Sequence, residues 1–142
     1  MLYKAFSVTL KDALAGTYSE PPPYSLYVVR DGETVFYVGQ TTDAIETRLQ
    51  RHALSSLGQF ITANAPESDG WQVELVDHRS CAPAVRAGLW PTLPDGARVD
   101  PDIAEIALIR VLRPCLNSTY NTNPRPLPER YQRRKSGRVR YG

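Results

Sequence analysis

Five side chains of the types used in phosphate chemistry occur at separate points of this sequence: Tyr27, Tyr37, Arg48, His52 and Glu105. An arginine guanidinium presents a planar fork of donors that fits a phosphate group. Histidine and tyrosine can move a proton, and a single carboxylate can anchor one Mg²⁺ that also binds substrate phosphate. Hydrolysis of a phosphodiester needs a deprotonated water, neutralised charge on the phosphoryl oxygens and a protonated or metal-bound leaving oxygen. The five residues could meet these needs if the fold brings them together.

A β-hairpin is predicted to position the two tyrosines. Leu26–Arg30 and Thr34–Gly39 are rich in Val, Tyr and Phe, and the dipeptide Asp31-Gly32 between them is a strong hairpin signal. Tyr27 and Tyr37 therefore lie on adjacent strands and can face each other across the hairpin.

The next segment is predicted to be a helix that carries Arg48 and His52. Asp43, with Glu46 three positions later, indicates its N-terminus. Arg48 and His52 share one face, one turn apart. The apolar stripe of this helix consists of Ile45, Leu49 and Ala53.

A second helix is predicted over Pro101–Leu112, with Asp100 as its cap. From its third residue onward almost every position is apolar, so the helix is expected to be buried on all sides. Glu105 in the middle of it is costly unless it is paired, protonated or bound to metal. It can form a salt bridge with Arg48 or Arg110, or it can serve a metal or catalysis.

The same residues fall within ordered motifs. SLY at 25–27 and YVG at 37–39 form a two-part tyrosine signature, and RLQRH at 48–52 follows an Arg-x-x-x-His pattern. AEIALIRVLRPCLN at 104–117 combines a glutamate-containing helix with a Pro-x-x-Asn motif. A single Tyr-x-Gly is a weak signal, whereas the ordered set is a strong one.

This set resembles the GIY-YIG nuclease family over roughly residues 24–117, in the Arg-x-x-x-His branch that is similar to GIY-YIG restriction endonucleases. Ser25 stands in place of the usual glycine, and Val38 in place of isoleucine.

The resemblance implies a role for each side chain. Tyr27 is expected to be the general base or to orient the attacking water, and Tyr37 to hydrogen-bond the scissile phosphate or that water. Arg48 is expected to clamp the phosphate, and His52 to assist proton transfer. Glu105 is expected to hold the one divalent metal, Mg²⁺, with Mn²⁺ able to substitute.

The resemblance also implies a fold of the α/β (α+β) class, a small GIY-YIG-like domain with a central three-stranded antiparallel sheet flanked by helices. Asn117 is expected to hydrogen-bond within the site or hold its loop, and Gly39 to let the backbone pass close to its neighbours. The side chains of Trp71–Asp77 show the two-residue alternation of a third strand, and residues 2–10 could form an opening strand. Further helices are expected over 54–63 and 80–88.

Length and charge suggest one domain and a basic arm. The 142 residues, 42 % of them hydrophobic, fit a single domain at 1–123 with its core at 24–117. The arm at 124–142 carries a net charge of +6 and the remainder −4. Such an arm suggests contact with nucleic acid, since Tyr131 and Tyr141 could stack on bases, although it could also be a solvated tail. Its basic residues are Arg125, Arg130, Arg133, Arg134, Lys135, Arg138 and Arg140.

Other features of the sequence limit the class of protein and its location. No apolar run approaches 18 residues and no secretory N-terminus is present, so neither membrane nor export is expected. Cys81 and Cys115 are isolated, which favours a cytoplasmic protein. A bacterial, archaeal or phage-encoded origin is also expected. His78 has no partner at ligand spacing and is interpreted as structural.

Together with these features, the resemblance to GIY-YIG nucleases implies a metal-dependent endonuclease that hydrolyses DNA phosphodiester bonds. One site cuts one strand, so cleavage of a duplex calls for a homodimer or sequential nicks. The alternatives are a nuclease for structured or single-stranded DNA or RNA in repair, recombination or defence, and a non-catalytic nucleic-acid-binding module of the same fold. A structural protein with a basic tail would leave Glu105 unexplained.

Overall fold

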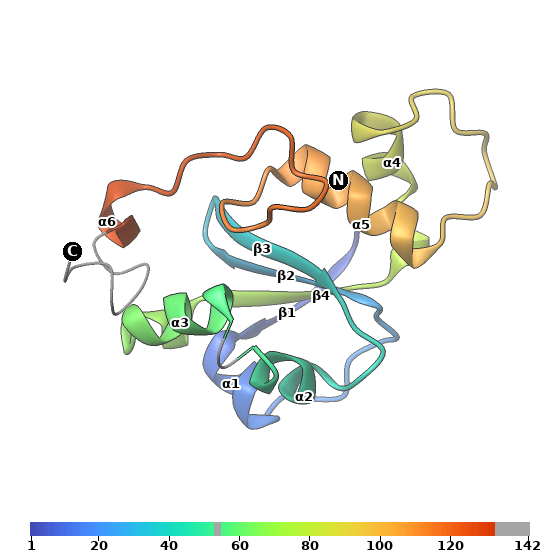
Figure 1. Ribbon diagram of the computed structural model, residues 1–142. Coiled ribbons are helices and arrows are strands. Elements are labelled where there is room, and N and C mark those ends of the chain that lie inside the picture. The colour runs from blue at the N-terminus through green and yellow to red at the C-terminus, as the bar shows by residue number, and fades with distance from the viewer. Residues whose placement is uncertain (53–54, 133–142) are drawn as a thin grey trace.

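The computed structural model describes residues 1–52 and 55–132. Within them the chain forms a mixed α/β fold around one antiparallel sheet of strand order β1-β4-β2-β3 (Figure 1). The strands are β1 (Ala5–Thr9), β2 (Leu26–Asp31), β3 (Thr34–Gln40) and β4 (Gln72–Val76).

The sheet has four strands, so the prediction of three was incomplete. The three expected strands are present as β2, β3 and β4, and the N-terminal segment adds β1 along β4. Phe6 pairs with Leu75 and Val8 with Val73. Residues of β1 alternate between exposed and half-buried, as an edge strand with one covered face does.

Helices cover both faces of the sheet (Figure 1). The helices α1, α2 and α3 pack on one face, around a core that includes Tyr27, Phe36 and Leu75. The helices α4 and α5 pack on the other face, around Leu26, Val28 and other buried residues. Their bounds are α1 (Leu10–Ala15), α2 (Ile45–Gln50), α3 (Ser56–Ala63), α4 (Ala82–Gly88), α5 (Pro101–Leu112) and, near the C-terminus, α6 (Glu129–Gln132).

The predicted hairpin is confirmed. Asp31 pairs with Thr34, and Gly32 takes a φ of +57°, a backbone conformation that glycine adopts without steric cost. A bulge then shifts the register, because Val29 pairs with Tyr37 whereas the next residue of β2 pairs with Val35. The bulge turns both Phe36 and Tyr37 toward the face covered by α1–α3.

Helix α2 begins later than predicted. Asp43 does not cap it; the Asp43 carboxylate pairs instead with Arg51 at 2.6 Å. The first helical amide, that of Ile45, donates to the Tyr24 hydroxyl at 2.9 Å, so a side chain distant in sequence takes the place of a local cap. Ile45 and Leu49 are buried as predicted, while Ala53 lies outside the described residues.

Helix α5 forms where predicted but is not buried on all sides. The Asp100 side chain accepts from the amide of Ile103 at 2.9 Å, which confirms the cap. Ala104, Ala107, Leu108 and Ile109 are buried, but Glu105 is only half-buried and Arg110 is exposed. The helix packs on the sheet and on α4, but part of its surface, including Glu105, stays accessible, so the assumption of a fully buried glutamate was wrong.

The described part of the basic arm packs on the domain. Tyr131 is 5 % exposed and its ring contacts Phe36, Phe60 and Trp71. Its hydroxyl donates to Asp31. Tyr131 is therefore a core residue and is not available to stack on bases, contrary to the prediction.

Candidate active site

The buried Tyr27 and His52 form the innermost part of the site. The Tyr27 hydroxyl and His52 Nε2 lie 2.8 Å apart, which joins strand β2 to the turn after helix α2. His52 lies two residues beyond Gln50, where the helix ends, so the prediction that this helix carries His52 was wrong. Tyr27 is 0 % exposed and His52 is 9 % exposed. Gly39 lies opposite Tyr27 in the β2–β3 pair, and a Cβ there would be 2.6 Å from both Cζ and Oη of Tyr27. The Tyr-x-Gly motif thus has a packing cause: only glycine leaves room for the ring.

Hydrogen bonds assign the tautomer of His52. The Ser55 hydroxyl donates to the His52 carbonyl at 2.7 Å, so its oxygen is left to accept from His52 Nδ1–H at 3.1 Å. The Nε2 lone pair is then free to accept the proton of the Tyr27 hydroxyl. Burial lowers the pKa of His52 below its usual 6.5, and the positive charge of Arg48 lowers it further. His52 is therefore neutral at pH 7 and can act as a proton acceptor.

The tyrosine hydroxyls themselves hold their protons firmly. Burial raises the pKa of Tyr27 well above 10; the neighbouring ionisable hydroxyl of Tyr37 adds to the rise, and the positive charge of Arg48 opposes it. Burial likewise raises the pKa of the half-buried Tyr37. The two rings lie 6.0 Å apart between centroids, and the Tyr37 ring lies 5.5 Å from that of His52. Neither tyrosine is a ready phenolate, so a proton leaves Tyr27 only toward an acceptor such as His52.

Arg48 lies beside this pair, and no carboxylate of the described residues pairs with it. Its Nε donates to the backbone oxygen of Gln40 at 3.1 Å, and it forms no salt bridge with any described acidic residue. A hollow of about 200 Å³ opens over Arg48 and Arg51, with Thr41 and Thr42 on its wall. A guanidinium at an open hollow, with no carboxylate partner among the described residues, is suited to bind a phosphate.

Glu105 approaches the site from the opposite layer. Its Oε1 accepts from Gln40 Nε2 at 2.8 Å, and the same nitrogen donates to Asp102 Oδ1 at 2.7 Å. Glu105 forms no salt bridge with Arg48 or Arg110, so neither of these two predicted ion pairs is present, and the side chain of Gln40 is its hydrogen-bond partner instead.

The donor set fits the implied Mg²⁺. Two carboxylate oxygens, from Asp102 and Glu105, converge on the amide nitrogen of Gln40, whose hydrogens carry partial positive charge. The described residues contain no group of three or more His, Cys, Asp or Glu side chains that could hold a metal. Mg²⁺ often uses only one or two carboxylates and retains several waters, so a sparse set of oxygen ligands is compatible with it.

Asn117 fixes the outer edge of the hairpin. Its Oδ1 accepts from the amide of Val38 at 2.9 Å and its Nδ2 donates to the Val38 carbonyl at 2.8 Å. The Asn117 side chain therefore makes the two hydrogen bonds to β3 that the backbone of a neighbouring strand would make. This is the loop-holding role expected of it, on a residue next to Tyr37 and Gly39.

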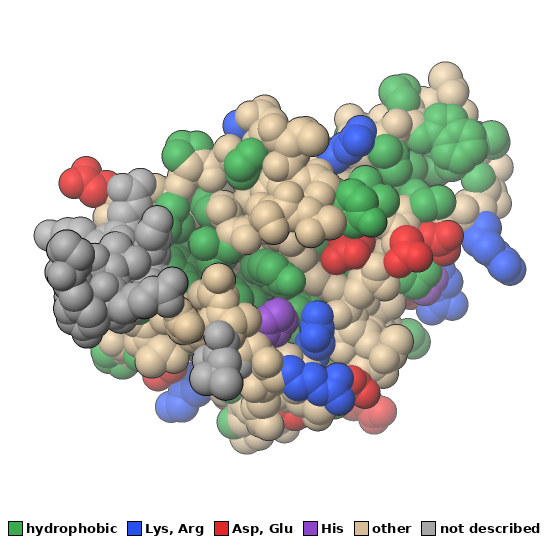
Figure 2. All heavy atoms as spheres, viewed as in Figure 1, with side chains coloured by type: hydrophobic (Ala, Val, Ile, Leu, Met, Phe, Trp, Pro, Cys, Tyr) green, Lys and Arg blue, Asp and Glu red, His purple; other side chains and the backbone are tan. Residues whose placement is uncertain are grey.

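The structure thus brings together Tyr27, Tyr37, Arg48, His52 and Glu105, at the end of β3 between α2 and α5. On this face, histidine, basic and acidic side chains gather between the two helices (Figure 2). Sequence reasoning missed the supporting residues Gln40, Ser55 and Asp102. Of these three, only Asp102 could have been found from the sequence. It precedes Glu105 by three positions on one helix, so the two carboxylates lie on the same face.

The described part of the basic arm, residues 124–132, contributes little to this site. Arg130 pairs with Asp31 at 2.9 Å, beside the aromatic cluster of Tyr131. The Arg125 amide donates to the carbonyl of Arg113 at 3.2 Å. The other basic residues predicted to bind nucleic acid lie outside the described residues: Arg133, Arg134, Lys135, Arg138 and Arg140.

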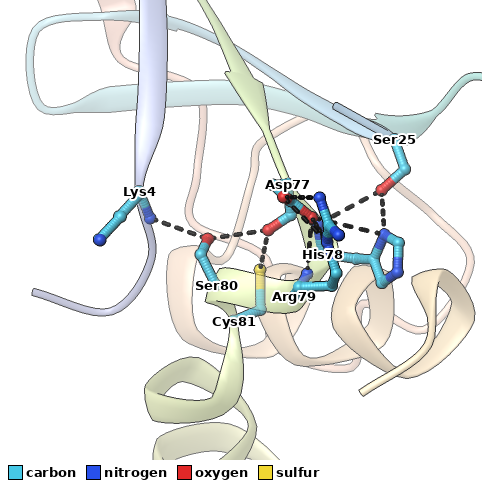
Figure 3. A network of polar contacts seen from close by, with 7 residues as sticks. All are labelled: Lys4, Ser25, Asp77, His78, Arg79, Ser80 and Cys81. Atoms are coloured by element: carbon cyan, nitrogen blue, oxygen red, sulfur yellow. Dashed lines mark hydrogen bonds and ion pairs between the residues drawn. The ribbon is translucent and has the colours of Figure 1, made fainter. Parts of the chain in front are cut away.

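A second group of polar side chains, around His78, lies at the end of β4 (Figure 3). The Ser25 hydroxyl and His78 Nδ1 are 2.8 Å apart, and Asp77 Oδ1 lies 3.9 Å from the same nitrogen. In a Ser-His-Asp triad the serine and the aspartate contact opposite ring nitrogens. Here the serine hydroxyl and the aspartate carboxylate both approach Nδ1. The Asp77 carboxylate also forms an ion pair with Arg79, with Nη2 and Oδ2 2.8 Å apart. The geometry agrees with the structural interpretation of His78.

Comparisons with protein-family models, curated proteins and solved structures find no match to this chain. None of the helices in the described part of the chain combines the length and apolar character needed to cross a bilayer.

Proposed function

We propose that this protein is a metal-dependent endonuclease that hydrolyses phosphodiester bonds in DNA, with a GIY-YIG-like site. The observation that carries the proposal is the 2.8 Å contact between the Tyr27 hydroxyl and a neutral His52, beside an Arg48 that has no carboxylate partner among the described residues. A proton acceptor and a phosphate-binding cation thus lie side by side. Glu105 completes the set from a separate helix.

In the proposed mechanism the proton of the attacking water passes to the Tyr27 oxygen while the Tyr27 proton passes to His52 Nε2. This relay avoids a free phenolate, which the raised pKa of Tyr27 disfavours. Ser55 holds His52 in the tautomer that the relay needs. Since Tyr27 is fully buried, the relay requires side chains near it to shift when substrate binds and admit the water.

Arg48 and Tyr37 act on the phosphate in this proposal. Both are half-buried and accessible, unlike Tyr27. Arg48 neutralises the charge that develops on the phosphoryl oxygens, and the Tyr37 hydroxyl donates to one of them. Glu105, with Asp102 near it, would hold Mg²⁺, which when bound supplies charge neutralisation at the phosphate and stabilises the leaving oxygen.

The test is cleavage of supercoiled plasmid and of circular single-stranded DNA, with Mg²⁺ or with EDTA. Wild-type protein is expected to cut in Mg²⁺ only. Tyr27→Phe is expected to lose at least about 100-fold in rate, the range of a catalytic proton transfer. Glu105→Gln is expected to lose at least about 100-fold as well, because it removes the carboxylate that would hold Mg²⁺. Glu33→Gln, on an exposed turn, and Tyr3→Phe, whose hydroxyl contacts Glu74, are the matched controls and keep full activity.

Equal rates for Glu105→Gln and the Glu33→Gln control would refute the proposed site. Absence of metal-dependent cleavage on every DNA and RNA substrate, with binding retained, would instead support the non-catalytic binding module.

A further inference from the structure

The exposed Tyr120 lies beside the proposed catalytic side chains. Its side chain is 53 % exposed, in contrast to the mostly buried aromatic residues of the core. It follows Asn117 in the segment that runs along strand β3. An exposed aromatic ring next to a proposed phosphate site is a feature that the mechanism above does not use.

The backbone of Tyr120 is held in an unfavourable conformation. Its φ is +62°, in the left-handed region that bulky side chains rarely adopt. Side chains anchor the chain around it: Asn117 is bonded to Val38, and Asn121 Nδ2 donates to the carbonyls of Pro114 at 2.7 Å and Asn117 at 3.0 Å. Such a conformation persists only where neighbours impose it, and it often occurs at functional sites.

A cavity of about 290 Å³ connects Tyr120 to the site. Tyr37 and Glu105 line it together with Asn117 and Tyr120. The cavity wall thus carries two proposed catalytic side chains and one exposed aromatic ring. A group held against Tyr120 would be adjacent to a phosphate held by Tyr37.

We propose that Tyr120 is a stacking platform for one unpaired nucleobase next to the scissile phosphate. The substrate is then DNA that is single-stranded, or a duplex with an unpaired nucleotide, at the point of cleavage. In an intact duplex both faces of each base are covered by neighbouring bases, whereas an unpaired base can leave the stack and enter a cavity. The inference rests on the proposed function, because it places the base relative to the proposed catalytic side chains.

The test measures binding of three oligonucleotides by fluorescence anisotropy in EDTA: a duplex with one bulged nucleotide, the same duplex with an abasic bulge, and a fully paired duplex. Tyr120→Ala is expected to weaken binding of the bulged duplex by about 5- to 150-fold, the loss expected for one stacked base. It should leave the abasic duplex unaffected. Tyr120→Phe, which keeps the ring, should stay within about twofold of wild type.

Trp90→Ala is the matched control, because Trp90 is also exposed, at 46 %, but does not line this cavity. It should leave all three affinities unchanged. Urea unfolding of each variant checks that the fold is intact; should Tyr120→Ala unfold, Tyr120→Leu replaces it. An equal loss on bulged and abasic duplexes, no loss at all, or no binding of any oligonucleotide by the wild type would overturn the inference.

Cleavage of the same oligonucleotides in Mg²⁺ separates this inference from the proposed function. If wild type cleaves and Glu105→Gln does not, while Tyr120→Ala binds and cleaves like wild type, only the stacking inference fails. If nothing is cleaved but binding depends on Tyr120 and on the base, only the proposed function fails.

Discussion

Replacing Gly39 with alanine tests whether the Tyr-x-Gly motif positions the Tyr27–His52 pair. A Cβ at position 39 would lie 2.6 Å from Tyr27 Cζ and Oη, whereas ordinary contact begins at 3.4 Å, so the ring has to move by about 0.8 Å. Tyr27 is fully buried, and its ring centroid lies 6.0 Å from that of Tyr37 and 6.3 Å from that of His52. The Tyr27 ring therefore cannot move freely. Overpacking of this kind costs about 1–3 kcal/mol of unfolding free energy.

The same displacement disturbs the 2.8 Å contact with His52. A misplacement near 1 Å can cost about 100-fold in rate, so Gly39→Ala should lose activity at temperatures where it stays folded. Urea unfolding and initial rates of DNA cleavage measure the two effects. Gly70→Ala is the control, because a Cβ there meets nothing within 4 Å. Wild-type stability and rate in Gly39→Ala would refute this account of the motif.

Other parts of the site can be tested by a pH profile, a Mg²⁺ titration and a salt dependence. Because the pKa of His52 is lowered below 6.5, kcat/KM should be constant near pH 7 and fall as pH drops through that lowered pKa, and a fall in kcat/KM that sets in above pH 7 would contradict a neutral His52 as the proton acceptor. Gln40→Leu should raise the Mg²⁺ concentration for half-maximal rate by about 10- to 100-fold, since the Gln40 side chain donates to Glu105; an unchanged Mg²⁺ titration would show that Gln40 does not orient Glu105. Deletion of residues 133–142 should reduce the slope of log affinity against log salt concentration by up to about 0.9 for each phosphate that this basic segment neutralises, whereas an unchanged slope would exclude the segment from DNA binding.

Local patterns predicted the elements that carry the site. Alternating Val, Tyr and Phe around Asp31-Gly32 defined the hairpin, because a tight turn between two β-prone runs depends only on neighbouring residues. Asp100 and Pro101 likewise defined the start of helix α5. Tyr27, Tyr37, Arg48 and Glu105 could therefore be assigned to their elements, and these four residues and His52 could be expected to meet.

Long-range contacts were not predictable in the same way. The start of α2 depends on Tyr24, which lies far from the helix in sequence, and the half-exposure of Glu105 depends on which side of α5 meets the sheet. The burial of Tyr131 depends on a core gathered from three other parts of the chain. Gln40 became apparent only as the residue whose backbone contacts Arg48 and whose amide contacts Glu105.

The most direct test of the proposed function is the single-turnover rate of DNA cleavage as a function of Mg²⁺ concentration, for wild type and Glu105→Gln. If Glu105 holds Mg²⁺, the wild-type rate rises with Mg²⁺ concentration and saturates, and the rate of the variant is at least about 100-fold lower at every concentration. Cleavage by wild type in EDTA, or the same Mg²⁺ dependence in both proteins, would contradict it.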